Sequence, residues 1–314
     1  MRIPESNLLP YLFMFLSSSF VFICSCSEKK HPVPASAMSV LEIKGDDAFS
    51  RTSAFYALGP KVSGTEGAAK AVEHIKNEIS RCGFTPETDE WKQATPVGNE
   101  TIFRNISVTI PGEKKEFLII GAHYDTKKIE TVPGFAGAND GASGVGLLLA
   151  FLDSLKKAGA KPPLTLKLFF FDGEEAFINY TEKDGLYGSR RAALLLKNSP
   201  PALKCKGVII VDMIGDRNLN ISIPSNSDPE LSSKVIELAK AFGWEKHFSK
   251  GNSAITDDHV PFLEIGIPAV DLIDFEYGEN NRYWHTAGDT IDKISPESLQ
   301  ISGTMLLFLV FSIE

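Results

Sequence analysis

The chain has 314 residues, of which 43% are hydrophobic and 23% are charged. These fractions are close to those of an average globular protein and exclude a disordered, collagen-like or coiled-coil chain. The formal net charge is −8, and lysine and arginine form no run of five or more. A nucleic-acid-binding protein is therefore not expected, because neutralising phosphates requires a basic patch.

The N-terminus has the order of a secretory signal, with a positive charge at Arg2, an apolar stretch over residues 8–23 and a polar segment after it. The tetrapeptide Ile23-Cys24-Ser25-Cys26 is similar to a bacterial lipoprotein cleavage box, which would leave a lipid on Cys26. An ordinary cleaved signal and an uncleaved anchor are the alternatives. In each case we expect the mature chain to work in the periplasm or the bacterial cell envelope.

Three segments are therefore expected along the chain. They are a signal peptide over residues 1–25, a flexible tether rich in proline, alanine and serine over residues 26–46, and one catalytic domain over residues 47–314. Two cysteines remain in that domain, Cys82 and Cys205. They could form a disulfide in an oxidising compartment, and two buried thiols are the alternative.

Within the domain, hydrophobic patterns predict helices and strands in alternation. Apolar residues at helical spacing predict a helix over residues 68–81, and regular alternation predicts a strand over residues 102–110. Continuous apolar runs, typical of strands buried on both faces, follow at residues 117–120, 164–171 and 208–211. Further helices are expected at residues 144–157, 188–197, 228–242 and 296–311, and a short strand at residues 269–273. This alternation predicts an α/β sandwich around a largely parallel central sheet.

Side chains that can bind a metal follow the ends of the predicted strands. They are His123, Asp125, Asp140, Glu174, Glu175, Asp212 and His285. Ligands of open α/β sheets collect at the carboxyl ends of the strands, so these side chains are expected to lie close together. Nitrogen and carboxylate ligands without a thiolate suit a catalytic zinc, either one ion or a pair that shares a carboxylate. Several buried carboxylates would repel one another without a cation.

Local spacing predicts different tasks within two pairs of these residues. His123 and Asp125 lie two residues apart on an extended chain, so Asp125 is expected to accept the second imidazole N–H of His123. Glu174 and Glu175 are adjacent and point in different directions. One of them can therefore bind the metal while the other faces the substrate as a general acid or base.

These residues also occur in the order of a known family. The series His123-x-Asp125, Asn139-Asp140, Asp172-Gly173-Glu174-Glu175, Asp212-Met213 and His285-Thr286 resembles the zinc aminopeptidase family of bacterial leucyl aminopeptidase type, over residues 50–314. The resemblance implies a single three-layer α/β/α sandwich with a mixed, mostly parallel central sheet. It also implies a zinc-dependent enzyme whose substrates are the N-termini of peptides or proteins.

Further stretches resemble one branch of that family, the glutaminyl-peptide cyclotransferases. They are residues 171–177, 184–190 and 257–263, together with Trp284 directly before His285. In that branch a single zinc is held by the residues that match Asp140, Glu175 and His285. The branch is implied to be an acyltransferase that converts an N-terminal glutamine to pyroglutamate and releases ammonia.

The same resemblance implies roles for the residues around the zinc. Glu174 would pass a proton to the departing ammonia, supported by a hydrogen-bond network that includes Asp257 and Asp212. Trp284 would line the substrate pocket, where Tyr180 stands in place of a tryptophan of the animal enzymes. Asp271 stands where those enzymes carry a histidine, which leaves the pocket's substrate preference open.

Two alternative functions remain on the same fold. A zinc aminopeptidase would bind a second zinc at His123 and Asp212, with Asp140 bridging the two ions. A non-catalytic module would keep the fold as a protein-binding surface. In all cases we expect a monomer that contacts a membrane only through its lipid anchor. Lys127 and Lys128 could attract a substrate carboxylate, and a solvated turn is the simpler interpretation.

Overall fold

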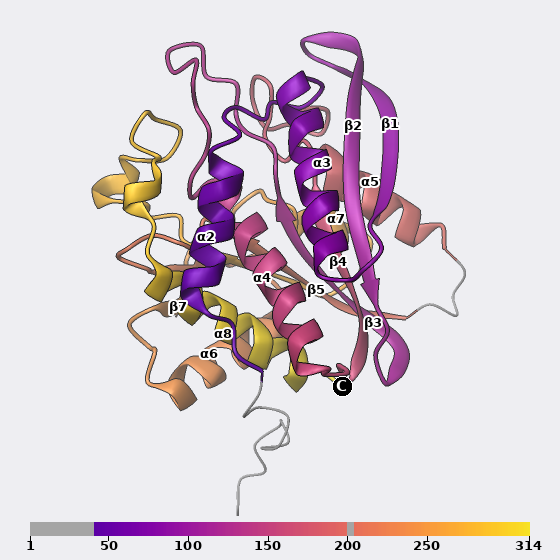
Figure 1. Ribbon diagram of the computed structural model, residues 1–314, viewed down its shortest axis with the longest axis vertical. Helices are drawn as coiled ribbons and strands as arrows, with labels where there is room; N and C mark the ends of the chain where they lie inside the picture. Colours follow the sequence, from indigo (N-terminus) through magenta and orange to yellow (C-terminus); the bar gives the residue numbers. More distant parts are fainter. Residues whose placement is uncertain (1–40, 200–203) are drawn as a thin grey trace, which may run out of the picture. The chain divides into compact units, whose positions relative to one another are not determined.

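The computed structural model describes residues 41–199 and 204–314 (Figure 1). The predicted signal peptide, the lipid site at Cys26 and most of the predicted tether lie outside these residues. The predicted end of the tether at residue 46 is wrong, because Leu41 and Ile43 are buried in the hydrophobic core and helix α2 already begins at Gly45. Residues 41–46 therefore belong to the folded domain.

A six-stranded mixed sheet forms the centre of the domain, in the order β1-β2-β4-β3-β5-β8. Its strands are β1 (Glu87–Thr95), β2 (Gly98–Ile110), β3 (Lys114–His123), β4 (Leu164–Phe171), β5 (Cys205–Asp212) and β8 (Ala269–Ile273). The neighbours β4, β3, β5 and β8 run parallel to one another. By contrast, β1 and β2 form an antiparallel hairpin, and β2 pairs antiparallel with β4. The mixed, mostly parallel sheet expected from the sequence is confirmed.

Helices cover both faces of this sheet and make the expected three layers. One face carries α2 (Gly45–Tyr56), α3 (Glu66–Arg81), α4 (Ala142–Ala158), α6 (Pro229–Phe242) and α8 (Pro296–Ser312). The other face carries α5 (Tyr187–Lys197) and α7 (Val260–Glu264). Outside the layers lie a small sheet of β6 (Ile221–Ile223) and β7 (Phe248–Lys250), and the 3-10 turns η1 (Glu279–Asn281) and η2 (Ile291–Lys293).

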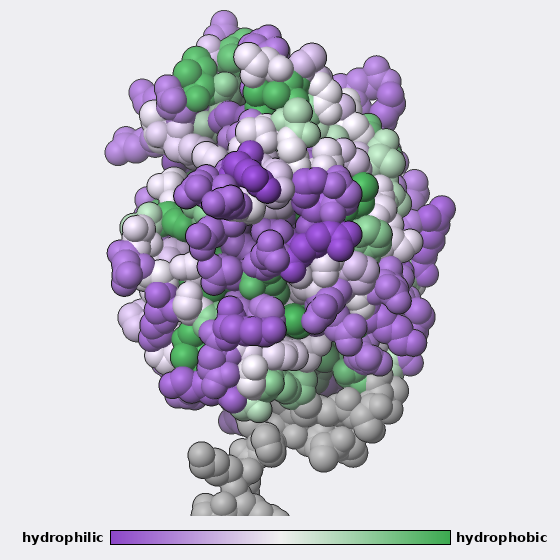
Figure 2. Space-filling view, turned by 90° about the vertical axis from the view of Figure 1, so that its left-hand side faces the viewer, coloured by the Kyte–Doolittle hydropathy of each residue, from purple (hydrophilic) through white to green (hydrophobic). Residues whose placement is uncertain are grey.

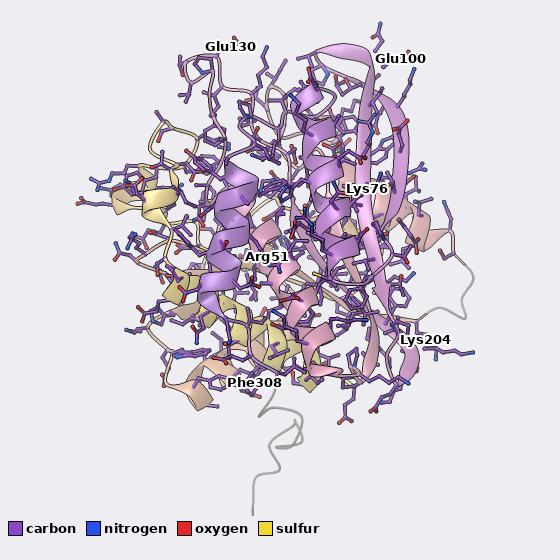
Figure 3. The ribbon with its side chains drawn as sticks, in the orientation of Figure 1. Arg51, Lys76, Glu100, Glu130, Lys204 and Phe308 are labelled. Atoms are coloured by element: carbon purple, nitrogen blue, oxygen red, sulfur yellow. The ribbon has the colours of Figure 1, made fainter. Side chains whose placement is uncertain are left out.

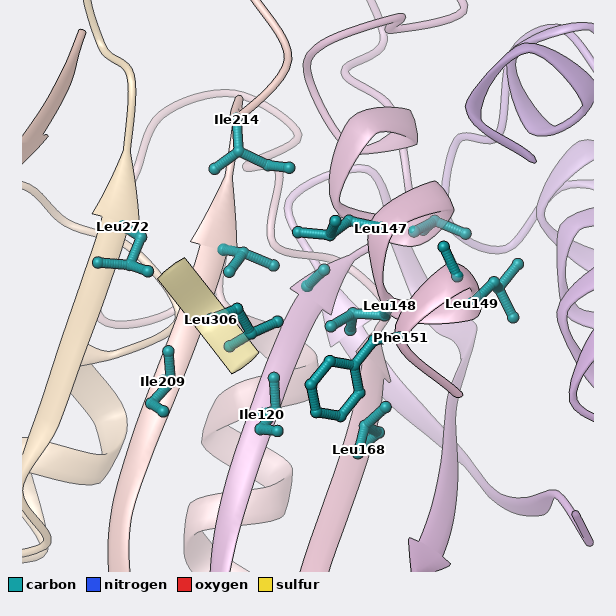
Figure 4. Packing of buried hydrophobic residues seen from close by; sticks show 14 of the residues in the cluster. Ile120, Leu147, Leu148, Leu149, Phe151, Leu168, Ile209, Ile214, Leu272 and Leu306 are labelled. Atoms are coloured by element: carbon teal, nitrogen blue, oxygen red, sulfur yellow. The ribbon is translucent and has the colours of Figure 1, made fainter. Parts of the chain in front are cut away.

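A strand buried on both faces supplies side chains to two hydrophobic clusters. In β3, Leu118 and Ile120 belong to the larger cluster, whereas Phe117 and Ile119 belong to the smaller one beneath α5 and α7. Figure 4 shows Leu148 and Phe151 of α4 packed over the sheet in the larger cluster. Burying one such side chain contributes about 1.5–3 kcal/mol to stability. This packing fixes the position of α4. The loop that carries Asp140, one of the metal-ligand candidates, lies directly before the N-terminus of this helix.

The surface of the domain and its two cysteines bear on two expectations from the sequence. On the face shown in Figure 2, hydrophilic residues predominate and the hydrophobic residues form small, separate groups. Within residues 41–199 and 204–314, no helix has the length and hydrophobicity needed to cross a bilayer. Among the described residues Cys82 and Cys205 form no disulfide, and of the two thiols Cys82 is buried, as the alternative expected, whereas Cys205 is only partly buried.

Candidate active site

The carboxyl ends of the parallel strands meet at one edge of the sheet, and the polar residues predicted for the site meet there. His123 ends β3, and Asp212 ends β5. Glu174 and Glu175 lie in the turn after β4. His285 arrives from the long segment between β8 and α8, with a left-handed φ of 53° that places its ring over the site. Such a backbone conformation is uncommon for a residue with a side chain and is concentrated at functional sites.

Asp140 reaches the site from the loop before α4. The loop turns sharply at Gly137 and Gly141, where φ is 58° and 89°. A Cβ atom on Gly141 would lie 3.1 Å from the carbonyl oxygen of Asp125 and 3.2 Å from Cε1 of His123. Glycine is therefore required at this position for the backbone to pass the imidazole and to present Asp140 to its neighbours.

Asp140, Glu175 and His285 form the first candidate metal group. Nε2 of His285 lies 2.9 Å from Oε1 of Glu175 and 3.2 Å from Oδ2 of Asp140. All three ligand atoms lie within 4.8 Å of one another. Both carboxylates are buried, at 3% and 5% exposure. The structure thus brings together the three residues that the sequence proposes as ligands of a single zinc.

His123, Asp140 and Asp212 form the second candidate metal group. Nε2 of His123 lies 3.1 Å from Oδ1 of Asp212 and 3.2 Å from Oδ1 of Asp140. Asp140 therefore turns one carboxylate oxygen to each group, Oδ1 to His123 and Oδ2 to His285. This is the arrangement of a carboxylate that can be shared between two ions.

The donor set fits a zinc ion on two grounds. Ligand atoms at 2.0–2.1 Å from a tetrahedral zinc lie about 3.3 Å from one another, close to the separations found around His285. In addition, Oδ2 of Asp140 is buried and, apart from its 3.2 Å ion-pair contact with His285, has no hydrogen-bond partner in the described part of the chain, which is costly unless a cation compensates its charge. Burial and the charge of Asp140 also raise the pKa of Glu175, a strain that a bound cation relieves.

Glu174 stands beside these groups without belonging to either. Its carboxylate is 6% exposed and accepts a hydrogen bond from the hydroxyl of Tyr180, which lies 3.0 Å from both Oε1 and Oε2. The same hydroxyl lies 3.2 Å from Oε2 of Glu175. Burial and the adjacent charge of Glu175 raise the pKa of Glu174 well above its ordinary value. Tyr180 therefore lines the predicted pocket and also contacts both glutamates.

Asp125 has a different task from the one predicted. Its Oδ1 lies 3.6 Å from Nδ1 of His123, too far for a hydrogen bond, and that nitrogen has no hydrogen-bond partner. Instead, the carboxylate accepts the backbone N–H groups of Glu174 at 3.0 Å and Glu175 at 3.3 Å. Asp125 therefore holds the turn that carries both glutamates, because the end of β4 lies directly beside the end of β3.

The predicted network around Glu174 is only partly formed. Asp257 lines the same cavity as Glu174 and accepts the backbone N–H of Asp258. Among the described residues, neither Asp257 nor Asp212 makes a hydrogen bond with Glu174, and Asp212 contacts His123 instead. Asp271 is fully buried, and within residues 41–199 and 204–314 neither of its carboxylate oxygens has a hydrogen-bond partner.

A cavity of about 310 Å³ opens above these carboxylates. Trp284 forms one wall and stacks on the ring of His285, with ring centroids 4.0 Å apart. Phe275 packs edge-on against Trp284 at 5.0 Å. Tyr180 and Asp257 also line the cavity. An aromatic wall with polar groups at the floor can hold a short polar side chain and exclude bulk water around it.

Several supporting residues escaped the sequence interpretation. Asp289 accepts the backbone N–H groups of Asn139 at 2.8 Å and Asp140 at 3.3 Å, and it accepts the hydroxyl of Tyr277 at 2.8 Å. Asp184 accepts three successive backbone N–H groups, at residues 177–179, and so closes the loop that carries Tyr180. The only sequence signal that could have identified Asp289 is its position four residues after the metal-ligand candidate His285.

Comparisons with known proteins agree with this geometry. Residues 105–310 match the profile of peptidase family M28. A glutaminyl-peptide cyclotransferase of Boiga irregularis is 30% identical in an alignment that is 310 positions long and covers 84% of this chain and 83% of that protein.

Solved structures show the same likeness. The crystal structure of a glutaminyl cyclase from an Acidobacteriales bacterium superposes with a TM-score of 0.80 at 35% identity, covering 86% of this chain and 94% of that one. A leucine aminopeptidase precursor from Bacteroides thetaiotaomicron superposes with a TM-score of 0.77 at 23% identity, covering 88% and 99%. The second likeness shows the fold that the two chains share.

Proposed function

The chain belongs to peptidase family M28 and to its glutaminyl-peptide cyclotransferase branch, and we propose that it cyclises the N-terminal glutamine of peptides to pyroglutamate with release of ammonia. The observation that carries this proposal is the position of Glu174. Its carboxylate stands free of both metal groups and faces the same aromatic-walled cavity that a glutamine side chain would enter.

Each residue of the site has a place in this reaction. We propose that Asp140, Glu175 and His285 hold one zinc ion. When bound, zinc supplies a Lewis acid for the side-chain amide carbonyl of the substrate. Trp284 and Phe275 enclose the glutamine side chain and keep it in reach of the substrate's own α-amine.

Glu174 moves the proton. It takes one from the attacking amine and delivers it to the departing amide nitrogen, which leaves as ammonia. Tyr180 holds the carboxylate of Glu174 in place during both steps, because its hydroxyl contacts both oxygens. No water molecule is consumed in this cyclisation, in contrast to the hydrolysis of a peptide bond.

The second candidate function is that of a zinc aminopeptidase. The specific observation in its favour is the complete group of His123, Asp140 and Asp212, which could hold a second ion. In that enzyme the same Glu174 would activate a water molecule for attack on the first peptide bond.

One experiment separates the functions. The purified domain, loaded with zinc, is incubated with a Gln-initiated peptide and with amino-acid anilides, and the products are identified by mass spectrometry. Cyclisation releases ammonia and lowers the mass of the peptide by about 17 Da, the mass of NH₃, without removing a residue. This result would support the cyclotransferase. Free amino acids would support the aminopeptidase, and no turnover by zinc-replete protein would support a non-catalytic module.

We further propose that the mature chain is an exported monomer, anchored in the cell envelope by a lipid on Cys26. The support is the order of charge, apolar stretch and cysteine in residues 1–26. Labelling cells with a radioactive fatty acid would mark the wild type and not a Cys26→Ser variant. Size-exclusion chromatography with light scattering would determine the oligomeric state.

A further inference from the structure

We propose that a second cavity beside the active site binds the residue that follows the N-terminal glutamine, and that Lys127 makes this subsite prefer an acidic side chain. The proposal rests on the cyclotransferase function proposed above. The second cavity has a volume of about 230 Å³ and is lined by the segment 60–65 and by the loop after β3, residues 127–135. Glu130, at the outer end of this loop, is labelled in Figure 3.

The two cavities flank the same metal group. Phe135 lines the second cavity and sets its ring edge-on against the imidazole of His285, with centroids 6.0 Å apart. Lys127 lines it as well, and its Nζ lies 3.7 Å from Oε2 of Glu175. Phe135 and Lys127 of the second cavity thus contact His285 and Glu175, which line the first. This adjacency supports the proposal that a peptide with its first residue in one cavity places its second residue in the other.

The geometry of cyclisation requires that the rest of the peptide leave the first cavity. When the α-amine closes on the side-chain amide, the first residue becomes a five-membered ring inside the first cavity. The only remaining branch is the backbone carbonyl, which carries the rest of the peptide out of that cavity. The floor of the first cavity is lined by carboxylates, Asp140, Glu174, Glu175, Asp212 and Asp257, so an acidic second residue could not turn back into it.

The second cavity has the opposite character. Its walls are apolar at Val62, Val132, Pro133 and Phe135, which suits the aliphatic stem of a glutamate. Its charged residues are Lys127, Lys128 and Glu130. An ion pair of 2.7 Å joins Lys128 to Glu130, and both of those side chains are largely exposed.

We assign the substrate contact to Lys127, the less exposed of the two lysines, whose ammonium group lies 3.7 Å from Oε2 of Glu175 and can pair with a second carboxylate. The lysine side chain is 15% exposed, donates to the carbonyl oxygen of Ala176 and lies over the ring of Tyr180, 5.3 Å from the centroid. These contacts hold the ammonium group at the border of the two cavities. A carboxylate in the second cavity would thus meet a positioned charge with little exposure to screening water.

The test compares two substrates within each enzyme variant, so that a general loss of activity cancels. The substrates are peptides that begin with Gln-Glu and Gln-Gln and are otherwise identical. We expect kcat/KM of the wild type to be about 3–10-fold higher for the Gln-Glu peptide, mainly through KM, and most of this preference to persist at high salt, because the pair is largely shielded from water.

Three variants sharpen the test. Lys127→Met should abolish the preference, and Val132→Glu, which adds a negative charge to the half-buried wall, should reverse it. Lys115→Met, at an exposed lysine near the opposite end of β3 and outside the cavity, is the matched control and should retain the preference. A preference that survives Lys127→Met, or equal rates of the wild type on both peptides, would overturn the subsite while leaving cyclisation established. Failure to cyclise either peptide would overturn the cyclotransferase and the subsite with it.

Discussion

The hydroxyl of Tyr180 lies 3.0 Å from each carboxylate oxygen of Glu174 and donates its proton to that group. A hydrogen bond to a charged group contributes about 1.5–3 kcal/mol. We therefore expect Tyr180→Phe to lower kcat by about 10–100-fold while the zinc content stays at the wild-type level. The measurement is steady-state ammonia release together with metal analysis.

A matched control for this substitution is Tyr56→Phe. Tyr56 lies half-buried on α2, and among the described residues its hydroxyl makes no hydrogen bond. It should keep the wild-type kcat. An unchanged kcat in Tyr180→Phe would show that Glu174 is positioned without this hydroxyl.

The two adjacent glutamates should separate activity from metal binding. Glu174→Gln should abolish turnover, by about 10²–10⁴-fold, and leave zinc bound, because Glu174 lies outside both metal groups. Glu175→Gln should lose zinc as well as activity, since Oε1 of Glu175 belongs to the group around His285. The measurement is the number of zinc ions per chain after dialysis, compared between the two variants. If only Glu174→Gln lost its zinc, Glu174 would be the ligand and Glu175 the group that transfers the proton.

Metal stoichiometry should distinguish the two histidines. A cyclotransferase with one zinc is expected to lose it in His285→Ala and to keep it in His123→Ala, because only the group with Glu175 is then used. Both substitutions remove one imidazole from a buried carboxylate cluster, so each controls for the other. Two zinc ions in the wild type, with one lost in His123→Ala, would favour the aminopeptidase.

Lys61 predicts a pH dependence of folding. It is fully buried beneath the loop that leads to Asp140, donates 2.8 Å hydrogen bonds to the carbonyl oxygens of Gly59 and Ala136, and burial lowers its pKa from 10.5 to about 7. Between these two values the unfolded chain binds more protons than the folded one, so the free energy of unfolding should rise with pH from about 7 to about 10.

The size of this effect is about 1.4 kcal/mol for each unit of the pKa difference, with a few kcal/mol as the upper limit. The measurement is the free energy of unfolding in urea of the wild type and of Lys61→Met, each in buffers of about pH 7, 8.5 and 10. The wild type should gain stability relative to the variant as pH rises. Parallel profiles of the two proteins would mean that Lys61 titrates as an exposed lysine.

The sequence allowed much of the central fold to be predicted, because buried strands and amphipathic helices carry periodic signals. Each helix and strand that was expected is present, and α3, for example, begins at Glu66, two residues before its predicted start. Helix α2 and strand β1 were not predicted. Strand β1 lies at the edge of the sheet with mostly exposed side chains, so its sequence lacks the apolar alternation of a half-buried strand.

In the site, too, only some of the contacts between residues could be predicted from the sequence. Asp140, Glu175 and His285 could be brought together from the order of strand ends, since parallel strands deliver their ends to one edge. The partners of Asp125 could not, because its hydrogen bonds to the turn after β4 depend on which strand lies beside β3. Likewise, the contact of Tyr180 with Glu174 depends on how Asp184 folds the intervening loop.

The shared position of Asp140 constrains how enzymes on this fold can diverge. Since one of its oxygens faces His123 and the other faces His285, a substitution there would damage both halves of the site together. Changes at His123 or Asp212 touch one half only. An enzyme on this fold therefore needs the aspartate whether it holds one ion or two, whereas His123 and Asp212 serve as ligands only for the second.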